Sequence, residues 1–183
     1  MATDPRERFQ QILVQLSALV RSDPRAALGQ IQKVMMQVGP EPNLLHLAGL
    51  AHGRVGEPTR AVELMQQSLK LHPPQPEVHN NLGKAFERAQ QLEEAEYHYR
   101  QALSLRENIV QAQHNIGLLL LSQQRFDEAE AELLHALAGA SRKVSLLTSL
   151  GKLYGEQEHY DQAIDYYLQA LAEDGNYVNA LHN

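Results

Sequence analysis

The sequence predicts an all-α protein, an α-solenoid of about five antiparallel helix-turn-helix hairpins followed by the start of another. Two observations predict this fold class. Glycine recurs at an interval of 34 residues, at Gly49, Gly83, Gly117 and Gly151. The chain has no Trp and only 5% aromatic residues, and its abundance of Ala, Leu, Gln and Glu favours helices over strands. A period of this length is typical of stacked helical units that bury their apolar faces against one another.

Two further ladders of small residues share the same period. One runs through Ala27, Ala61, Ala95, Ala129 and Ala163, and the other through Val34, Ser68, Ala102, Ala136 and Ala170. Small side chains at fixed places in two consecutive amphipathic helices let the helix axes approach to roughly 8 Å, the short end of the usual range. Each period is therefore predicted to form one hairpin. Larger side chains are expected beside the close contact, such as Leu120 with Leu133 and Tyr154 with Tyr167.

The N-terminal hairpin, residues 1–41, departs from this pattern in its first helix. Its second helix is regular, because Asp23 can cap it and Pro24 suits the first helical position. In the first helix, a strict register would bury Gln10, Gln11 and Gln15 and would expose the apolar stripe of Phe9, Ile12, Leu13, Leu16 and Leu19. Either a turn near Ser22 about two residues longer than usual returns this stripe to the core, or the stripe is an exposed patch for a partner or for self-association.

Four regular repeats are expected to follow, at residues 42–75, 76–109, 110–143 and 144–177. The short turns RVGEPT, AQQLEE, SQQRFD and EQEHYD divide each repeat into two helices. Residues 178–183 belong to the start of a further, truncated repeat. We therefore expect this chain to be the N-terminal part of a longer protein.

The most regular copy is QPEVHNNLGKAFERAQQLEEAEYHYRQALSLREN, at residues 75–108. In the repeats, a Leu-Gly pair is followed in order by an aromatic or aliphatic residue, by an Ala, by a Tyr or Leu, and by an Ala-Leu pair. This order and spacing resemble the tetratricopeptide repeat. The repeats are also similar to those of O-GlcNAc-transferase-like and other bacterial tetratricopeptide proteins. This resemblance implies a right-handed solenoid whose first helices line a concave groove that binds extended peptides or helices.

The positions on either side of each Leu-Gly pair are expected to face that groove. They are His46, Leu47, Leu50, Arg54, Asn80, Asn81, Lys84, Arg88, His114, Asn115, Leu118, Ser149 and Lys152, with His182 and Asn183 on the following rung. Asn81, Asn115 and Asn183 share one repeat position, and Ser149 occupies the missing rung. An amide can both donate to and accept from a peptide backbone, so this ladder could grip an extended chain without reading its sequence. The alternative is that Asn is simply the commonest residue at this position in ordinary repeats of this kind.

Charge narrows the class of partner. The net charge is -6 and no concentrated basic surface is visible in the sequence, so nucleic acid is disfavoured as a partner. Lys84, Arg88 and Lys152 nevertheless make the central groove basic, so an acidic peptide or protein segment is the favoured partner. The alternative is that these long side chains only solvate the groove.

The sequence carries no pattern for chemistry. There is no Cys, and His46, His114 and His182 share one repeat position at steps of two repeats, roughly 20 Å apart, too far to hold one metal ion. No phosphate-binding or nucleophile motif occurs. We therefore predict no metal, no cofactor and no catalysis within these residues. The absence of a signal peptide or a long apolar run leads us to expect no membrane contact and a cytoplasmic location.

Three classes of function fit this description. The first is a protein-interaction module that binds a peptide or protein segment in its groove. The second is a substrate-recruiting arm of a larger enzyme, in which a glycosyltransferase, sulfotransferase or oxygenase domain follows. The third is a scaffold that self-associates through apolar solenoid ends.

Overall fold

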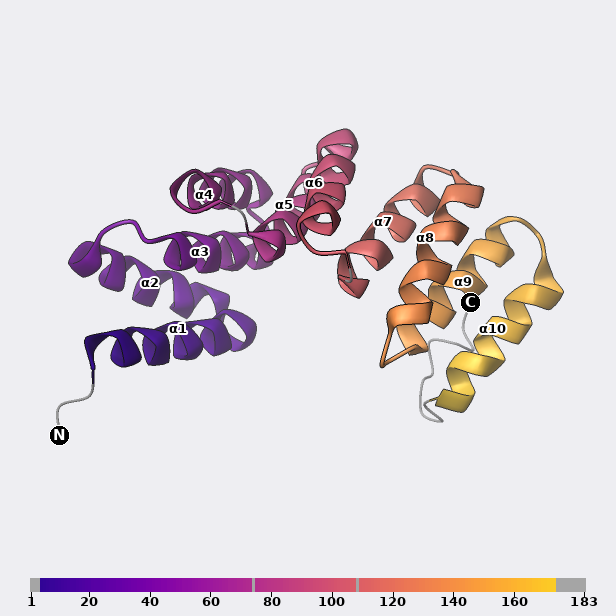
Figure 1. Cartoon of the computed structure of the whole chain (residues 1–183), viewed down its shortest axis with the longest axis horizontal. Coiled ribbons are helices and arrows are strands. Elements are labelled where there is room, and N and C mark those ends of the chain that lie inside the picture. The colour runs from indigo at the N-terminus through magenta and orange to yellow at the C-terminus, as the bar shows by residue number, and fades with distance from the viewer. Residues whose placement is uncertain (1–3, 74, 108, 174–183) are drawn as a thin grey trace. The chain divides into compact units, whose positions relative to one another are not determined.

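The computed structural model describes residues 4–73, 75–107 and 109–173, and the described part consists of α-helices joined by short turns, with no strand (Figure 1). The predicted all-α repeat fold is confirmed. The helices are α1 Pro5–Ser22, α2 Pro24–Val38, α3 Pro42–Val55, α4 Pro58–Leu71, α5 Pro76–Arg88, α6 Leu92–Leu105, α7 Val110–Ser122, α8 Phe126–Gly139, α9 Val144–Glu156 and α10 Tyr160–Glu173. Residues 178–183, predicted to open a further repeat, lie outside the described residues, as do His182 and Asn183 among them.

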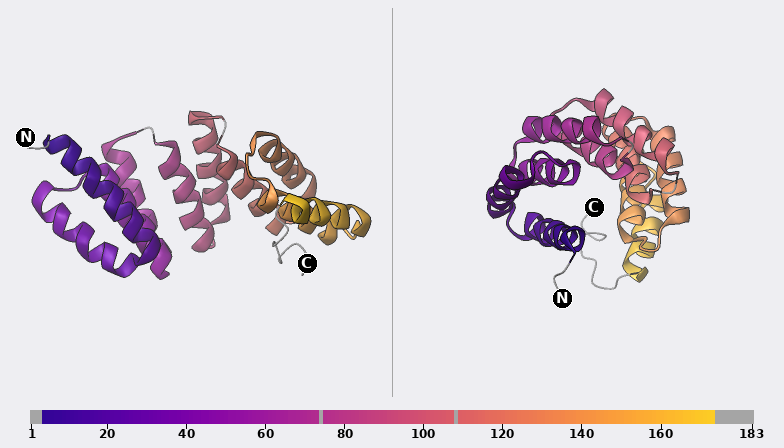
Figure 2. Two further views of the ribbon diagram at one scale, coloured as in Figure 1. Left: turned by 90° about the horizontal axis from the view of Figure 1, so that it is seen from below. Right: turned by 60° about the vertical axis from the view of Figure 1, so that its left-hand side comes forward.

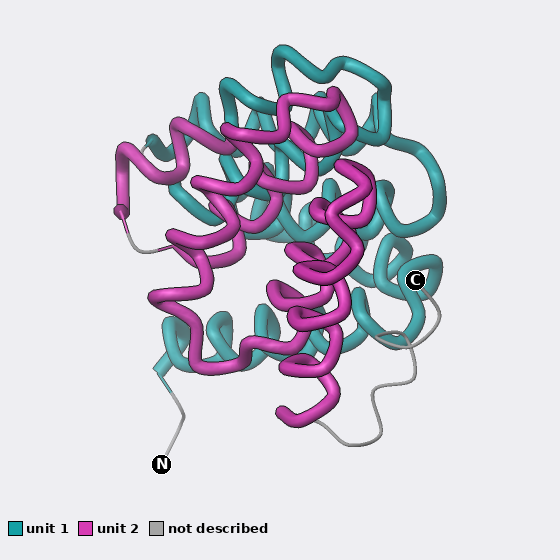
Figure 3. Tube along the Cα trace, turned by 90° about the vertical axis from the view of Figure 1, so that its right-hand side faces the viewer, with its two compact units in different colours: residues 1–98 teal, residues 99–183 magenta. Residues whose placement is uncertain are grey.

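Two compact units make up the chain, residues 1–98 and residues 99–183 (Figure 3). In the first unit, the helices α1 to α5 pack successively against one another, and α3 also contacts α1 and α5. Figure 2 shows α1 and α2 as neighbouring helices of one hairpin. In the second unit, α7 to α10 pack successively in the same way, and α7 also contacts α9.

Prolines mark the starts of α1 to α5, and acidic side chains cap α1, α2 and α3. Each helix from α1 to α5 begins with a proline, which suits the first helical position because its missing N–H has no partner in the helix. The carboxylate of Asp23 accepts a hydrogen bond from the backbone N–H of Ala26 at 3.0 Å. The predicted cap at Asp23, with Pro24 directly after it, is therefore confirmed.

The small residues lie where two helices of a hairpin touch. A Cβ atom placed on Gly117 would lie 2.6 Å from Cγ of Leu133, and one on Gly49 would lie 2.8 Å from Cγ of Met65. Both distances are too short for carbon atoms, so only glycine lets these helices approach. This confirms that the glycine ladder marks the close contacts within hairpins.

One predicted aromatic pair is different in the structure. The ring of Tyr167 lies over Gly151, where a Cβ atom would come within 2.5 Å of it. Tyr154 instead stacks on Tyr166, with ring centroids 5.3 Å apart. Tyr167 therefore fills the space beside Gly151, and the adjacent residue Tyr166 makes the ring contact with Tyr154.

The apolar stripe of the first helix is buried. Leu13, Leu16 and Val20 belong to the core, and Phe9, Ile12 and Leu19 pack against it. The three glutamines Gln10, Gln11 and Gln15 are exposed. The alternative of an exposed interaction patch on this stripe is therefore wrong, and so is the predicted longer turn, because Asp23 alone separates α1 from α2.

A different connection explains the rotated first helix. The four later hairpins turn through a left-handed residue at one repeat position, occupied by Gly56, Gln90, Gln124 and Glu158. After it, a backbone N–H bonds the carbonyl five residues earlier, as from Arg125 to Leu120 at 3.0 Å. Asp23 has φ −145° and provides no such turn. The direct connection sets α1 at a different rotation, and its apolar stripe then faces the core.

The last described helix carries an apolar stripe on its outer side. Tyr160, Ile164 and Leu168 follow one another at intervals of four residues on α10, and each is more than half exposed. None of the described helices combines the length and the apolar character needed to cross a lipid bilayer.

Candidate functional site

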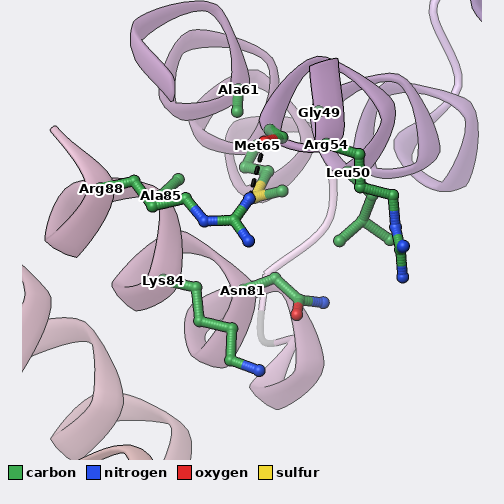
Figure 4. A pocket seen from close by; sticks show the side chains of 10 residues that line it. Gly49, Leu50, Arg54, Ala61, Met65, Asn81, Lys84, Ala85 and Arg88 are labelled. Carbon is green, nitrogen blue, oxygen red and sulfur yellow. Dashed lines mark hydrogen bonds between the residues drawn. The ribbon is translucent and has the colours of Figure 1, made fainter. Parts of the chain in front are cut away.

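A pocket of about 210 Å³ opens between α3, α4 and α5 in the first unit (Figure 4). Its floor consists of small or apolar residues, namely Gly49, Gly53, Ala61, Met65 and Ala85. Its rim consists of longer side chains, namely Leu50, Arg54, Asn81, Lys84 and Arg88. In Figure 4, Lys84 and Asn81 lie on one side of the open space, and Leu50 and Arg54 lie on the other. The glycine and alanine ladders thus leave a hollow that cationic side chains surround.

Arg88 joins two sides of this pocket. Its Nη1 donates a hydrogen bond to the backbone carbonyl oxygen of Gly53, 2.6 Å away on α3 (Figure 4). A Cβ atom on Gly53 would lie 3.7 Å from this nitrogen, which is an ordinary contact distance. The bond holds the guanidinium of Arg88 across the gap between α5 and α3.

The pocket concentrates positive charge. Partial burial lowers the pKa of the Lys84 ammonium, and the nearby charges of Arg88 and Arg54 lower it further, while Glu87 opposes them. No acidic side chain lines the pocket. Among the residues that the structure describes, none of the three cations forms an ion pair with a carboxylate.

Asn81 is held by a histidine of the preceding repeat. Its Nδ2 lies 2.9 Å from Nε2 of His46. Burial lowers the pKa of His46 to about 4, although the charge of Glu77 opposes this, so the neutral ring accepts a hydrogen bond from the amide. The same link recurs two repeats later, between His114 Nε2 and Ser149 Oγ at 2.8 Å. These side chains therefore connect successive first helices.

The structure brings five of the predicted groove residues together in the pocket: Leu50, Arg54, Asn81, Lys84 and Arg88. Leu47 is instead a core residue, 8% exposed, in the apolar cluster that also contains Leu13 and Leu16 of α1. Its predicted place in the groove is therefore wrong, because the N-terminal hairpin covers it. Asn80 is also buried, with 8% of its surface exposed.

The predicted residues of the second unit lie partly in the interior and partly at the surface. Asn115 is buried, and its Oδ1 accepts a hydrogen bond from Gln111 Nε2 at 3.0 Å. Ser149 is buried as well, whereas Leu118 and Lys152 are exposed. Of the proposed amide ladder, only Asn81 reaches the pocket, and Asn183 lies outside the described residues.

Two contributions to the site were missed at the sequence level. Gly53 supplies the carbonyl that fixes Arg88, and Met65 supplies part of the floor. Gly53 follows Gly49 by one helical turn, so a second gap on the same helix face could have been inferred from this spacing. Across the described residues, no three His, Asp or Glu side chains lie close enough together to hold a metal ion.

Comparison with known proteins gives the same fold. PilF of Pseudomonas aeruginosa superposes with a TM-score of 0.82 at 19% identity, over 97% of this chain and 82% of that one. MamA of Desulfovibrio magneticus RS-1, from residue 41 to its end, gives 0.77 at 16% identity, over 96% and 99%. YrrB, a tetratricopeptide repeat protein described as having an unusual peptide-binding site, gives 0.70 at 18% identity, over 93% and 89%. No curated protein sequence is matched significantly.

Family models agree with these structures. Two models described as tetratricopeptide repeat match this sequence, one over residues 46–112 and the other over residues 108–172. Together they extend from the middle of α3 almost to the end of α10. The chain therefore belongs to the tetratricopeptide repeat family.

Proposed function

We propose that this chain is a protein-interaction module that binds an acidic peptide segment of a partner at the pocket between α3, α4 and α5. The tetratricopeptide repeat fold supports a role in protein–protein interaction. The similar protein YrrB is itself described as having a peptide-binding site. The residues that line the pocket indicate which chemical groups the partner presents.

The observation that carries the proposal is the set of three cations, Arg54, Lys84 and Arg88, around a pocket with no lining carboxylate. The whole chain has a net charge of -6, so its overall field repels an acidic partner. At physiological salt, charges are screened beyond about 8 Å, so an anion in the pocket interacts mainly with the three local cations. A carboxylate of the partner can form charge-assisted hydrogen bonds with them.

Apolar side chains beside the cations favour a mixed sequence in the partner. Leu50 is half-buried on the rim, and Met65 and Ala85 form part of the floor. An extended peptide places successive side chains on opposite faces at about 3.3 Å per residue, so residues two apart can face this surface together. We propose a segment in which an acidic residue and an apolar residue both face the pocket.

Panning of a random, unmodified peptide library against the purified chain tests this proposal. We expect selected peptides to be enriched in Asp and Glu, and their binding in fluorescence anisotropy to weaken with salt. Selection of peptides without acidic residues would contradict the proposal.

Two matched double variants then assign the binding to the pocket. Arg54→Gln with Lys84→Gln removes an arginine and a lysine from the rim and should weaken binding by about 1–3 kcal/mol. Arg60→Gln with Lys70→Gln removes the same charges from exposed positions on α4 outside the pocket and serves as control. Equal losses of affinity in the two variants would show that only the net charge matters.

A further inference from the structure

We infer that the pocket between α3, α4 and α5 recognises a phosphorylated side chain of the peptide, a phosphate monoester, in preference to a carboxylate. This inference rests on the proposed function, since it names the chemical group that a peptide partner presents to the same pocket.

The first argument is the balance of charge. Arg54, Lys84 and Arg88 contribute three positive charges to the rim, and no acidic side chain lines the pocket. More than one positive charge therefore faces the pocket without a carboxylate in the lining. A single carboxylate neutralises one of these charges, whereas a phosphate monoester carries roughly −1.5 to −2 at neutral pH.

The second argument is the arrangement of donors. The three cations come from two helices and from opposite sides of the pocket, as Figure 4 shows for Arg54 and Lys84. A planar carboxylate presents two oxygens in one plane, while a phosphoryl group presents three oxygens in a tetrahedral arrangement. One oxygen is then available for each cation.

The third argument is that one of the donors is already held in place. Nη1 of Arg88 donates a hydrogen bond to the carbonyl oxygen of Gly53, 2.6 Å away, and this bond restricts where the rest of the guanidinium lies at the pocket. Its charge and that of Arg54 also lower the pKa of Lys84, so both arginines disfavour the positive charge of this lysine. A doubly charged anion offsets the positive charge around Lys84 more than a singly charged anion does.

The space fits the group. A pocket of about 210 Å³ exceeds the roughly 30 Å³ that one water molecule occupies in the liquid several times over. A phosphoryl group and the first carbon atoms of its side chain can therefore enter together. Gly49, Gly53 and Ala85 have small side chains or none, so this part of the floor leaves room for the group.

The test compares short acetylated and amidated peptides that differ at one position, which holds phosphoserine, serine, glutamate or two consecutive glutamates. Binding to the full chain is followed in phosphate-free buffer by NMR, through the backbone amide shifts of Gly49, Gly53 and Ala85. We expect the phosphoserine peptide to bind at least tenfold more tightly than either glutamate peptide, with the largest shifts at these amides.

The two double variants defined above serve as the matched pair. Arg54→Gln with Lys84→Gln should remove at least tenfold of the affinity for the phosphoserine peptide, while Arg60→Gln with Lys70→Gln should change it less than threefold. Circular dichroism checks that both variants keep their helices. Equal losses in both variants would overturn the assignment to this pocket.

The remaining outcomes separate this inference from the proposed function. Equal affinity for the phosphoserine and glutamate peptides would overturn the phosphoryl preference and leave acidic-peptide binding intact. Inorganic phosphate that binds as tightly as the phosphoserine peptide would replace peptide recognition by a site for free phosphate. If none of the peptides binds and library panning also selects none, both the inference and the proposed function fail.

Discussion

Arg88 donates a hydrogen bond from Nη1 to the backbone carbonyl of Gly53, which lies 35 residues earlier in the sequence. This bond connects the first helices of two successive repeats at the edge of the pocket. It links the stability of the repeat junction to the position of a cation proposed to bind the partner.

Replacement of Arg88 by Met should lower the free energy of unfolding by about 0.5–1 kcal/mol, measured by urea denaturation. The loss is at the lower end for a charged donor because Arg88 is exposed and water can take its place. Arg54→Met is the matched control, since Arg54 makes no hydrogen bond or ion pair with the described residues. Equal changes in the two variants would show that the bond to Gly53 adds no stability.

Two glycines should respond in opposite directions to replacement by alanine. Gly117→Ala should destabilise the chain by about 1–2 kcal/mol, because the new Cβ would meet the fully buried Leu133. Gly29→Ala should stabilise it by about 0.5–1 kcal/mol, because no atom lies within 4 Å and alanine favours the helix. Thermal unfolding measures both changes. A stabilised Gly117→Ala variant would disprove the close-contact explanation of the glycine ladder.

The left-handed turn residues offer a separate test. Gln124 has φ 59°, a conformation that costs residues with a side chain about 1–2 kcal/mol, so Gln124→Gly should stabilise the chain by about 0.5–1 kcal/mol once the entropy of glycine is included. The control is Gln123→Gly, one residue earlier at φ −93°, which should be neutral or destabilising. If both glycine variants gain stability equally, turn conformation is not the cause.

Acid should weaken the fold through two histidines. Burial lowers the pKa of His46 to about 4, and burial together with the neighbouring His79 lowers the pKa of His98 to about 4. Between pH 6.5 and 4 the unfolded chain binds more protons at these positions than the folded chain does. Their contribution is therefore complete above pH 6.5, declines as the pH falls through this window, and reaches its minimum below pH 4.

Removal of the titrating ring tests this contribution. His46→Gln should reduce the loss of stability between pH 7 and pH 4.5 by about 2 kcal/mol relative to the unmodified chain, measured by urea denaturation at each pH. The matched control is His159→Gln, which replaces an exposed histidine. Identical pH profiles for His46→Gln and the unmodified chain would exclude a contribution from His46.

The close contacts between paired helices could be predicted from the sequence, because these contacts depend on the small size of the residues at them. Gly117 faces Leu133 in the structure, and the ladder containing Gly117 already marked this close contact. The rotation of α1 could not be predicted, since it depends on the backbone conformation at Asp23 rather than on a residue type. The register of the apolar stripe suggested a longer connection, whereas the structure has a shorter one.

The rim of the candidate site could also be predicted, because Asn81, Lys84 and Arg88 share one face of a single helix. The burial of Leu47 could not, since the N-terminal hairpin that covers it lies in another repeat. The engagement of Asn81 by His46 likewise depends on the distance between two helices. Sequence periodicity gives the face on which a side chain lies, and only the packed neighbours decide whether that side chain is free.

The apolar stripe of α10 has a practical consequence for handling the protein. Tyr160, Ile164 and Leu168 expose adjoining apolar surface to solvent, and such patches promote aggregation at high protein concentration. Ile164→Lys would interrupt the stripe at its centre without entering the packed interior. Preparations for crystallisation or long NMR experiments should therefore begin with this substitution.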